Sequence, residues 1–381
     1  MGRWRATTNR RFVVVAAIGA LLAACGSDGS ADPESSEPAP ATDGVAADST
    51  RVTLTVPAPS LAGNLVGDPA EVDVVVQLPA SYAASPDRRY PVVYYLAGFD
   101  EPASIASIGS EQDRLVEAGA VDEMILVGVS GDNALGGSFY VDSPVTGNWA
   151  QLVVEDVVGA VDREFRTLPS ADSRGIAGFS MGGFGEFDLA MRHPDVFGAV
   201  YAASPGFFDP EGLAASQMFA DPTVVGDFIG MQEALWAMPP GESAESMMSA
   251  IPGGDVRFAL AYGMAFSPDP ARAPYVEYPF ATVGGARDDA VWARWEAGYG
   301  GIADEVDRFH DNLVALRGIV IDYGVNDEYE WIPPGCEFLH EQLDAAGVPH
   351  RVEQHDGGHG PVGPRAGAVM LPFFDEVLEM S

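Results

Sequence analysis

The chain has 381 residues, of which 47% are hydrophobic, so it can bury the core of one large domain or of two ordinary ones. It carries 20 arginines, no lysine and 56 acidic residues, which gives a formal net charge of −36 at pH 7. Such a charge makes nucleic acid a very poor partner, because its phosphates would be repelled. The acidic residues indicate a soluble, self-repelling surface rather than a set of metal ligands.

The first 24 residues are expected to be a lipoprotein signal peptide. Arginines at positions 3, 5, 10 and 11 precede an apolar run at 12–24, which is too short for a comfortable transmembrane helix. Leu22-Ala23-Ala24-Cys25 is similar to a bacterial lipobox, in which Cys25 becomes the lipidated first residue of the mature chain. An ordinary signal peptide with a chance cysteine is the alternative. The lipobox predicts an exported protein that a lipid anchor holds at the membrane of the cell envelope.

Residues 25–50 are predicted to be a disordered tether between this anchor and a folded domain. They are almost all Gly, Ser, Ala, Asp, Glu, Pro or Thr, which cannot bury enough apolar area to fold. Cys336 is the only cysteine besides Cys25, so no disulfide is expected within the mature chain. The domain at 51–381 must therefore be stabilised by its core.

Apolar runs and turn residues after position 50 predict alternating strands and helices. Apolar residues alternate at 51–56 and 72–78, as in strands near the edge of a sheet. Continuous apolar runs at 92–96 and 124–129 are typical of buried parallel strands. Further strands are expected at 175–178, 198–205, 318–324 and 351–354, and helices at 105–118, 149–165, 184–192, 303–316, 334–346 and 366–380. This order indicates an α/β fold with a doubly wound, mostly parallel sheet.

The pattern breaks between residues 206 and 301. This segment is rich in Pro, Gly, Met and Trp, and it is too long for a simple connection in a compact domain. We expect a large, partly helical insertion over the carboxyl ends of the strands, where such sheets bind ligands. A second independent domain is the alternative. The Met and Trp residues favour either an apolar acyl or aromatic site or simply the core of the insertion.

Ser180 lies at the centre of a G-x-S-x-G motif, Gly178-Phe179-Ser180-Met181-Gly182. The motif follows a predicted strand and precedes a predicted helix, as a nucleophilic serine on a sharp turn requires. Glycines on both sides let two backbones approach closely, and a helix start offers free N–H groups to an oxyanion. The alternative is a glycine-rich turn with an incidental serine.

A serine nucleophile needs a base, and the base needs a carboxylate to orient it. Asp327 and His359 follow Ser180 in the chain order of α/β-hydrolases, and each comes directly after a predicted strand. Loops that follow parallel strands gather at one edge of the sheet, so we expect the three side chains to meet there. The competing acids are Glu328, Glu330 and Asp322.

Among the six histidines, His355 is the main rival of His359 for the role of base. The glycines beside His359 favour that residue, because they suit a loop that presents a ring to a site. A metal site at the His355–His359 pair lacks a third ligand at a telling spacing. The other histidines are expected to cap, pack or lie at the surface: His193, His310, His340 and His350.

An oxyanion site needs two N–H donors near the serine. The backbone of Met181, just after the nucleophile, is expected to supply one of them. The loop after the strand at 92–96 should supply the other, which makes the Phe99 amide the candidate and Gly98 the residue that permits the turn.

Several motifs along the chain together resemble a known family. The motifs are Leu61–Asn64, Tyr90–Tyr94, Ser143–Trp149, Gly178–Gly183, His193–Phe197 and Gly358–His359. They are similar to those of the Putative esterase family, which includes esterase D (S-formylglutathione hydrolase), siderophore and feruloyl esterases and the secreted mycolyltransferases. The resemblance covers nearly all of residues 51–381 and is loosest in the insertion.

The resemblance implies an α/β-hydrolase fold, a triad of Ser180, Asp327 and His359, and oxyanion amides at Phe99 and Met181. Many family members have His-Gly where this chain has Ala97-Gly98, but a backbone donor does not need that side chain. The family spans several substrate classes, so the resemblance does not name the ester.

The sequence thus predicts a lipid-anchored serine esterase that needs no cofactor or metal and acts on a small-molecule, lipid or sugar ester. Transfer of the acyl group to a sugar or lipid alcohol, as in the mycolyltransferases, remains an alternative with the same triad. A binding protein on an inactive hydrolase scaffold is the third candidate. Loss of a triad residue would favour it, and none is missing.

Overall fold

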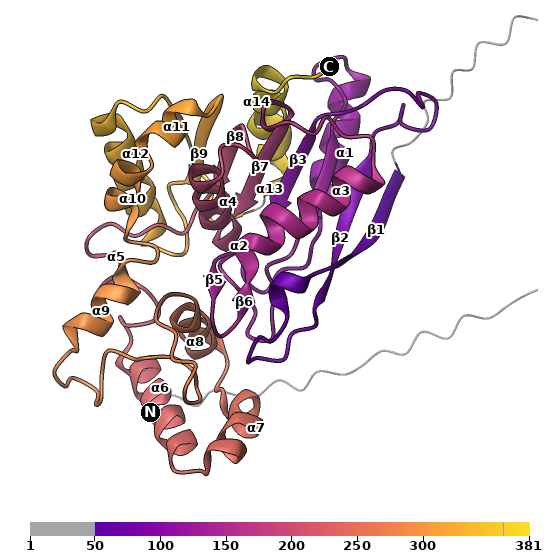
Figure 1. The fold of residues 1–381 in the computed structure, drawn as a ribbon. Helices are drawn as coiled ribbons and strands as arrows, with labels where there is room; N and C mark the ends of the chain where they lie inside the picture. The colour runs from indigo at the N-terminus through magenta and orange to yellow at the C-terminus, as the bar shows by residue number, and fades with distance from the viewer. Residues whose placement is uncertain (1–49, 361) are drawn as a thin grey trace, which may run out of the picture. The chain divides into compact units, whose positions relative to one another are not determined.

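The computed structural model describes residues 50–360 and 362–381 (Figure 1). The predicted signal peptide, Cys25 and the predicted tether up to residue 49 lie outside the described residues. Thr50, expected at the end of the tether, is instead the first residue of strand β1, which spans Thr50–Pro57. None of the helices that are described has the length and apolar character needed to cross a membrane.

An eight-stranded sheet forms the centre of the domain, in the order β1-β2-β4-β3-β7-β8-β9-β10. The strands after β1 are β2 (Glu71–Leu78), β3 (Val92–Leu96), β4 (Ile125–Val129), β7 (Arg174–Phe179), β8 (Ala199–Ala203), β9 (Gly318–Gly324) and β10 (Arg351–His355). β1 and β2 pair antiparallel, β2 joins β4 antiparallel, and every later pairing in the sheet is parallel. The expected doubly wound, mostly parallel sheet is confirmed.

The central strands are buried on both faces, which is why their sequences are continuously apolar. All five residues of β3 are buried, as are those of β4 and β8. In β3, Val92, Tyr94 and Leu96 pack into one apolar cluster, and Val93 and Tyr95 pack into another on the opposite face. The sheet is therefore the middle layer between two hydrophobic cores.

Helices cover both faces of the sheet (Figure 1). Helix α1 (Ala106–Glu117) and the C-terminal helices α13 (Val362–Arg365) and α14 (Leu371–Val377) lie on one face. Helices α2 (Trp149–Gln151), α3 (Val158–Glu164), α4 (Met181–Arg192) and α12 (Ile332–Ala346) lie on the other. A short hairpin, β5 (Asp142–Ser143) and β6 (Gly147–Asn148), precedes α2.

Three predicted helices are interrupted. The helix expected at 149–165 contains a π-helical turn at Leu152–Val157, and the one expected at 366–380 contains another at Ala366–Met370. The second turn comes just before Pro372, which lacks the N–H that a regular helix would use. The helix expected at 303–316 divides at Phe309 into α10 (Ile302–Arg308) and α11 (His310–Ala315). The apolar spacing predicted the buried face correctly but not these breaks in hydrogen bonding.

The segment between β8 and α10 is partly helical, and Figure 1 shows α6–α9 gathered together. Its helices are α5 (Gly212–Ala215), α6 (Pro222–Trp236), α7 (Pro240–Ala250), α8 (Gly254–Phe266) and α9 (Asp289–Glu296). Aromatic rings hold them together: Phe228 stacks on Tyr278 at 3.9 Å between ring centroids, and both rings pack on Trp295. Trp295 is fully buried, so this tryptophan belongs to the core of the segment.

Candidate active site

Ser180 occupies the sharp turn between β7 and α4. Its backbone angles, φ 57° and ψ −114°, are strained for a residue that carries a side chain. The turn also needs its two glycines. A Cβ on Gly182 would lie 2.1 Å from the carbonyl oxygen of Leu96, and one on Gly178 would lie 2.3 Å from that of Gly182. The motif therefore has a steric cause, since only glycine allows β3, β7 and α4 to approach this closely.

Backbone hydrogen bonds on both sides hold Ser180 in this conformation. Its N–H donates to the carbonyl of Ala203 at 2.9 Å, and its own carbonyl accepts from Phe184 at 3.1 Å and Gly206 at 3.2 Å. These bonds tie the turn to the end of β8 and to the first turn of α4. The surrounding structure thus stabilises an angle that the residue would not adopt alone.

Asp327 and His359 come together as the sequence predicted. Nδ1 of His359 lies 2.7 Å from Oδ2 of Asp327, whose side chain is fully buried, whereas that of His359 is 17% exposed. The other carboxylate oxygen of Asp327 accepts the backbone N–H of Tyr329 at 2.8 Å. The carboxylate thereby holds the proton on Nδ1 and leaves Nε2 free to act as a base.

The ring of His359 is held from two sides by aromatic residues. Phe179, the neighbour of Ser180, lies 4.6 Å from it between ring centroids. Tyr329 meets it edge-on at 4.9 Å. The contact with Phe179 brings His359 beside the residue that precedes the serine, and both Ser180 and His359 line the same cavity.

The competing residues have other partners. His355 lies 3.7 Å from Asp322, and Asp322 is paired with Arg365 at 2.8 Å. These two rivals therefore pair with each other and with Arg365, and of the three only Asp322 is fully buried. His193 forms the C-terminal cap of α4, in agreement with the prediction.

Glu328 has a role that the sequence did not reveal. Its carboxylate accepts the backbone N–H of His359 at 2.8 Å, and this hydrogen bond lowers the pKa of Glu328. Two adjacent carboxylates, on Asp327 and Glu328, thus hold the side chain and the backbone of the same histidine. Sequence spacing does not predict which carboxylate contacts the ring and which contacts the backbone, because both residues lie in one loop.

The cavity at Ser180 has a volume of about 190 Å³ and largely aromatic walls. Its lining comprises Gly98, Phe99, Glu101, Phe179, Ser180, Gln217, Phe258, Tyr299, Tyr329, Trp331 and His359. Gln217, Phe258 and Tyr299 come from the segment at 206–301. This segment therefore forms part of the wall around the serine.

The loop after β3 presents the expected second N–H group. Gly98 donates to the side chain of Glu101 at 3.0 Å, and Asp100, at φ 61°, donates to the carbonyl of Gly136 at 2.6 Å. The N–H of Phe99 between them, and that of Met181 at the start of α4, donate to no other group within the described residues. Both groups are available to an oxyanion.

A buried carboxyl group lies directly behind the serine turn. Glu186 of α4 is fully buried, and neither of its side-chain oxygens has a hydrogen-bond partner in the part of the chain that the structure describes. Burial raises the pKa of Glu186 well above its ordinary value, because a buried charge loses its hydration. Sequence reasoning missed it, because its helical position is that of an ordinary core residue.

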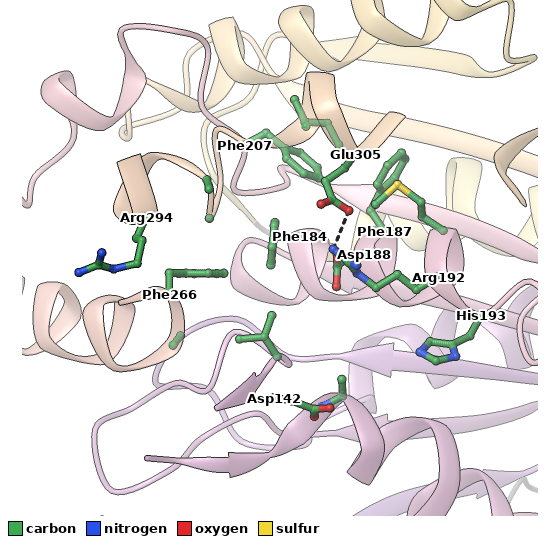
Figure 2. A pocket seen from close by; sticks show the side chains of 17 residues that line it. Asp142, Phe184, Phe187, Asp188, Arg192, His193, Phe207, Phe266, Arg294 and Glu305 are labelled. Atoms are coloured by element: carbon green, nitrogen blue, oxygen red, sulfur yellow. Dashed lines mark hydrogen bonds and ion pairs between the residues drawn. The ribbon is translucent and has the colours of Figure 1, made fainter. Parts of the chain in front are cut away.

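A second cavity, of about 490 Å³, lies beside α4 (Figure 2). Phe184 and Phe266 point into it, and Arg192 pairs with Asp188 at 2.8 Å and with Glu305 at 2.7 Å. The ring of Phe184 lies 4.7 Å from that of Tyr299, which lines the cavity at Ser180. Two aromatic side chains in contact therefore separate the two cavities.

The fold, with its serine turn and the Asp327–His359 pair on loops after parallel strands, is that of an α/β-hydrolase. Residues 69–361 match the family described as Putative esterase, and the chain belongs to this family. A solved ferulic acid esterase superposes with a TM-score of 0.56 at 20% identity, covering 87% of this chain and 99% of that one. An S-formylglutathione hydrolase from Agrobacterium tumefaciens gives 0.50 at 17% identity, covering 88% and 98%.

Curated relatives match a shorter part of the chain. An endo-1,4-beta-xylanase/feruloyl esterase of Xylanibacter ruminicola is 27% identical over 150 residues, which is 36% of this chain and 20% of that protein. An esterase of Mycobacterium tuberculosis is 32% identical over 125 residues, or 32% of this chain and 26% of that protein. The chain thus aligns with only a fifth to a quarter of the length of these relatives.

Proposed function

We propose that this protein is a serine carboxylic-ester hydrolase that acts through an acyl-enzyme on Ser180. The observation that carries the proposal is the 2.7 Å hydrogen bond between Asp327 and His359, together with the cavity that His359 and Ser180 both line. It supplies an oriented base beside a serine on a strained turn, which is the constellation that acyl transfer needs. Membership of the Putative esterase family supports it independently.

In the first half-reaction, Nε2 of His359 takes the proton of the Ser180 hydroxyl, and Oγ of Ser180 attacks the ester carbonyl carbon. The negative charge moves to the carbonyl oxygen, which accepts hydrogen bonds from the N–H groups of Phe99 and Met181. Asp327 stabilises the imidazolium. The tetrahedral intermediate then expels the alcohol, which leaves with the proton from His359, and the acyl group stays on Ser180.

In the second half-reaction, water replaces the alcohol. His359 removes a proton from the water as it attacks the acyl carbon, and the same two N–H groups hold the oxyanion. Collapse of this intermediate releases the carboxylic acid, and His359 returns its proton to the Ser180 oxygen. The proposed cycle consumes one water per ester and requires no cofactor.

The cavity favours esters whose acid part is compact and apolar or aromatic. Its volume of about 190 Å³ is small, and six aromatic side chains line it besides His359. Rings that meet edge to face offer a flat substrate both apolar contact and favourable electrostatics. Two of the similar proteins are named as feruloyl or ferulic acid esterases, which agrees with an aromatic acyl group.

We also propose that the protein is exported and anchored in the membrane of the cell envelope by a lipid on Cys25. The support is the sequence Leu22-Ala23-Ala24-Cys25 after a basic and an apolar segment. The full chain should fractionate with membranes, and Cys25→Ser should release it or leave it unprocessed. Equal membrane retention of the two forms, with equal processing of both, would contradict the anchor.

Hydrolysis of p-nitrophenyl acetate, p-nitrophenyl butyrate and methyl ferulate by the purified chain tests the proposed reaction. Activity and labelling by a fluorophosphonate should both fall to background in Ser180→Ala. An active Ser180→Ala variant would overturn the mechanism. Absence of both activity and labelling in the unaltered chain would instead favour a binding protein on this scaffold. Faster product formation with an added sugar or lipid alcohol, with the acyl group recovered on it, would favour acyl transfer.

A further inference from the structure

We propose that His340, Asp344 and His350 form a binding site for a divalent transition metal ion, with zinc as the ion that fits best. One potential ligand atom from each residue lies within 4.8 Å of the other two. None of the three lines the cavity at Ser180. The site is therefore separate from the proposed reaction and does not depend on it.

Local structure explains how the three side chains meet. His340 and Asp344 are four residues apart on α12, so they lie on the same face of the helix one turn apart. The helix ends at Gly347, whose φ of 71° turns the chain back. His350 then comes just before β10, and its side chain, only 3% exposed, packs against the end of the helix.

The tautomer of His350 suits a metal ligand. Its Nδ1 lies 2.8 Å from the carbonyl oxygen of Val348, and a carbonyl can only accept, so Nδ1 carries the proton. Nε2 therefore presents its lone pair. A histidine that donates one ring N–H to a backbone carbonyl while its other nitrogen faces outward has the arrangement typical of metal-binding histidines.

The spacing of the ligand atoms is close to that of a metal site. Nε2 of His350 lies 2.7 Å from Nδ1 of His340 and 4.0 Å from Oδ1 of Asp344. Ligand atoms around a tetrahedral zinc, each about 2.0–2.1 Å from it, are about 3.3 Å apart. The two observed distances lie on either side of this value, so shifts of less than about 1 Å complete the site.

Binding of a metal ion requires the proton between the two histidine rings to move, and His340 can accept it on its other ring nitrogen. The two rings now share one hydrogen bond, in which Nδ1 of His340 donates to Nε2 of His350. When the metal takes the place of this proton, the proton moves to Nε2 of His340, which lies 3.9 Å from Oδ2 of Asp344. Water completes the tetrahedron. Two imidazoles and one carboxylate favour Zn²⁺, Co²⁺, Ni²⁺ or Cu²⁺ over Mg²⁺ and Ca²⁺, which prefer oxygen ligands throughout.

The position of the site indicates a structural role. Helix α12 follows the loop that carries Asp327, and β10 precedes the loop that carries His359. A metal ion at the turn between α12 and β10 would join the two elements that support this pair. The net charge of −36 also raises the local concentration of cations. We therefore expect the ion to stabilise the folded chain rather than to take part in chemistry.

The test is metal binding by the full-length chain after treatment with EDTA. Calorimetry with ZnCl₂ and absorption spectra with CoCl₂ should reveal an ion bound by nitrogen and oxygen ligands. A zinc concentration of about 100 times Kd should raise Tm by about 4 °C. His340→Asn and His350→Asn should each weaken binding by more than about tenfold, since even outer-shell substitutions commonly cost that much.

His310→Asn is the matched control, because His310 also lies beside a carboxylate, 3.1 Å from Asp311, but belongs to no such group of three among the residues that the structure describes. It should bind zinc like the unaltered chain. The affinity of each variant is compared at a temperature where its metal-free form is folded, so that a loss of stability is not mistaken for a loss of ligand. Zinc binding that His340→Asn and His350→Asn leave unchanged, or the absence of binding in the unaltered chain, would overturn the proposal.

Discussion

Arg257 of α8 reaches across to Asp100 in the loop that presents the Phe99 amide, with nitrogen–oxygen distances of 3.2 and 3.3 Å. Phe258, the next residue, meets the ring of Phe99 edge-on at 4.9 Å. The helical segment at 206–301 is thus attached to the proposed oxyanion loop by one ion pair and one pair of rings. Asp100 has φ 61°, so this attachment also holds a strained residue in place.

Arg257→Ala should therefore lower kcat for p-nitrophenyl butyrate by up to about fivefold, because a partly exposed ion pair contributes up to about 1 kcal/mol. High salt should reduce the activity of the unaltered chain in the same direction. Arg287→Ala is the control, since Arg287 forms an exposed pair with Asp289 in the same segment. An equal loss in the control would show that the effect is general and not due to the oxyanion loop.

Asp327→Asn should lower kcat by about 10³–10⁴, because an amide favours the wrong tautomer of the catalytic histidine. Glu328→Gln changes the adjacent residue, which holds only the backbone of His359. It should cost less than about tenfold, since it weakens a single hydrogen bond. Steady-state kinetics of both variants check this division of roles. Similar losses in the two, or a larger loss in Glu328→Gln, would contradict it.

Phe184→Ala should open the wall between the cavity at Ser180 and the second cavity of about 490 Å³. The ratio of kcat/KM for p-nitrophenyl octanoate to that for the butyrate should rise about tenfold, because each buried methylene contributes about 0.8 kcal/mol and burial of about two more of them corresponds to this factor. Phe187→Ala is matched in residue type, helix and burial, and Phe187 lines the second cavity with its ring packed on that of Phe207. It should leave the ratio unchanged. A ratio that does not change in Phe184→Ala would show that the wall does not limit acyl length.

Glu186→Gln should change how stability depends on pH. The pKa of Glu186 is raised in the folded state, so the folded chain binds a proton that the unfolded chain releases above its ordinary pKa. The stability that this group contributes is therefore complete at low pH and falls as pH rises beyond about 4.3, the reference value for glutamate. Glutamine stays neutral at every pH. The Tm of the variant should therefore rise relative to that of the unaltered chain between pH 5 and pH 8, because only the unaltered chain loses stability as Glu186 ionises in the unfolded state.

Thermal unfolding of the two proteins over this pH range is the measurement. The difference in Tm should be small at the acid end and grow toward pH 8. Glu305→Gln is the control, because it makes the same substitution at a carboxylate that is paired with Arg192. A constant difference across the range would indicate that Glu186 is already ionised in the folded chain.

The alternation of apolar and turn residues was sufficient to predict every strand of the main sheet and the order of its helices. This is because the periodicity of apolar residues and the order of the elements can be read from residues that are close together in the sequence. Ser180 was equally clear, since Gly178 and Gly182 are required by contacts within the turn itself. Asp327 and His359 could be chosen because each follows a strand, and the edge where parallel strands end is a consequence of topology.

Other features depend on residues that are distant in sequence. Whether Asp327, Glu328 or Asp322 faces His359 is decided by the packing of two loops, and the structure pairs Asp322 with Arg365 instead. The contact of Arg257 with Asp100 spans 157 positions, and the cluster of His340, Asp344 and His350 depends on how the chain turns at Gly347. The sequence alone determined the layers of the fold and the serine turn, because short-range sterics and periodic burial encode them. Only the tertiary structure decided which carboxylate, aromatic ring or histidine meets which partner, because those choices depend on distances across the folded chain.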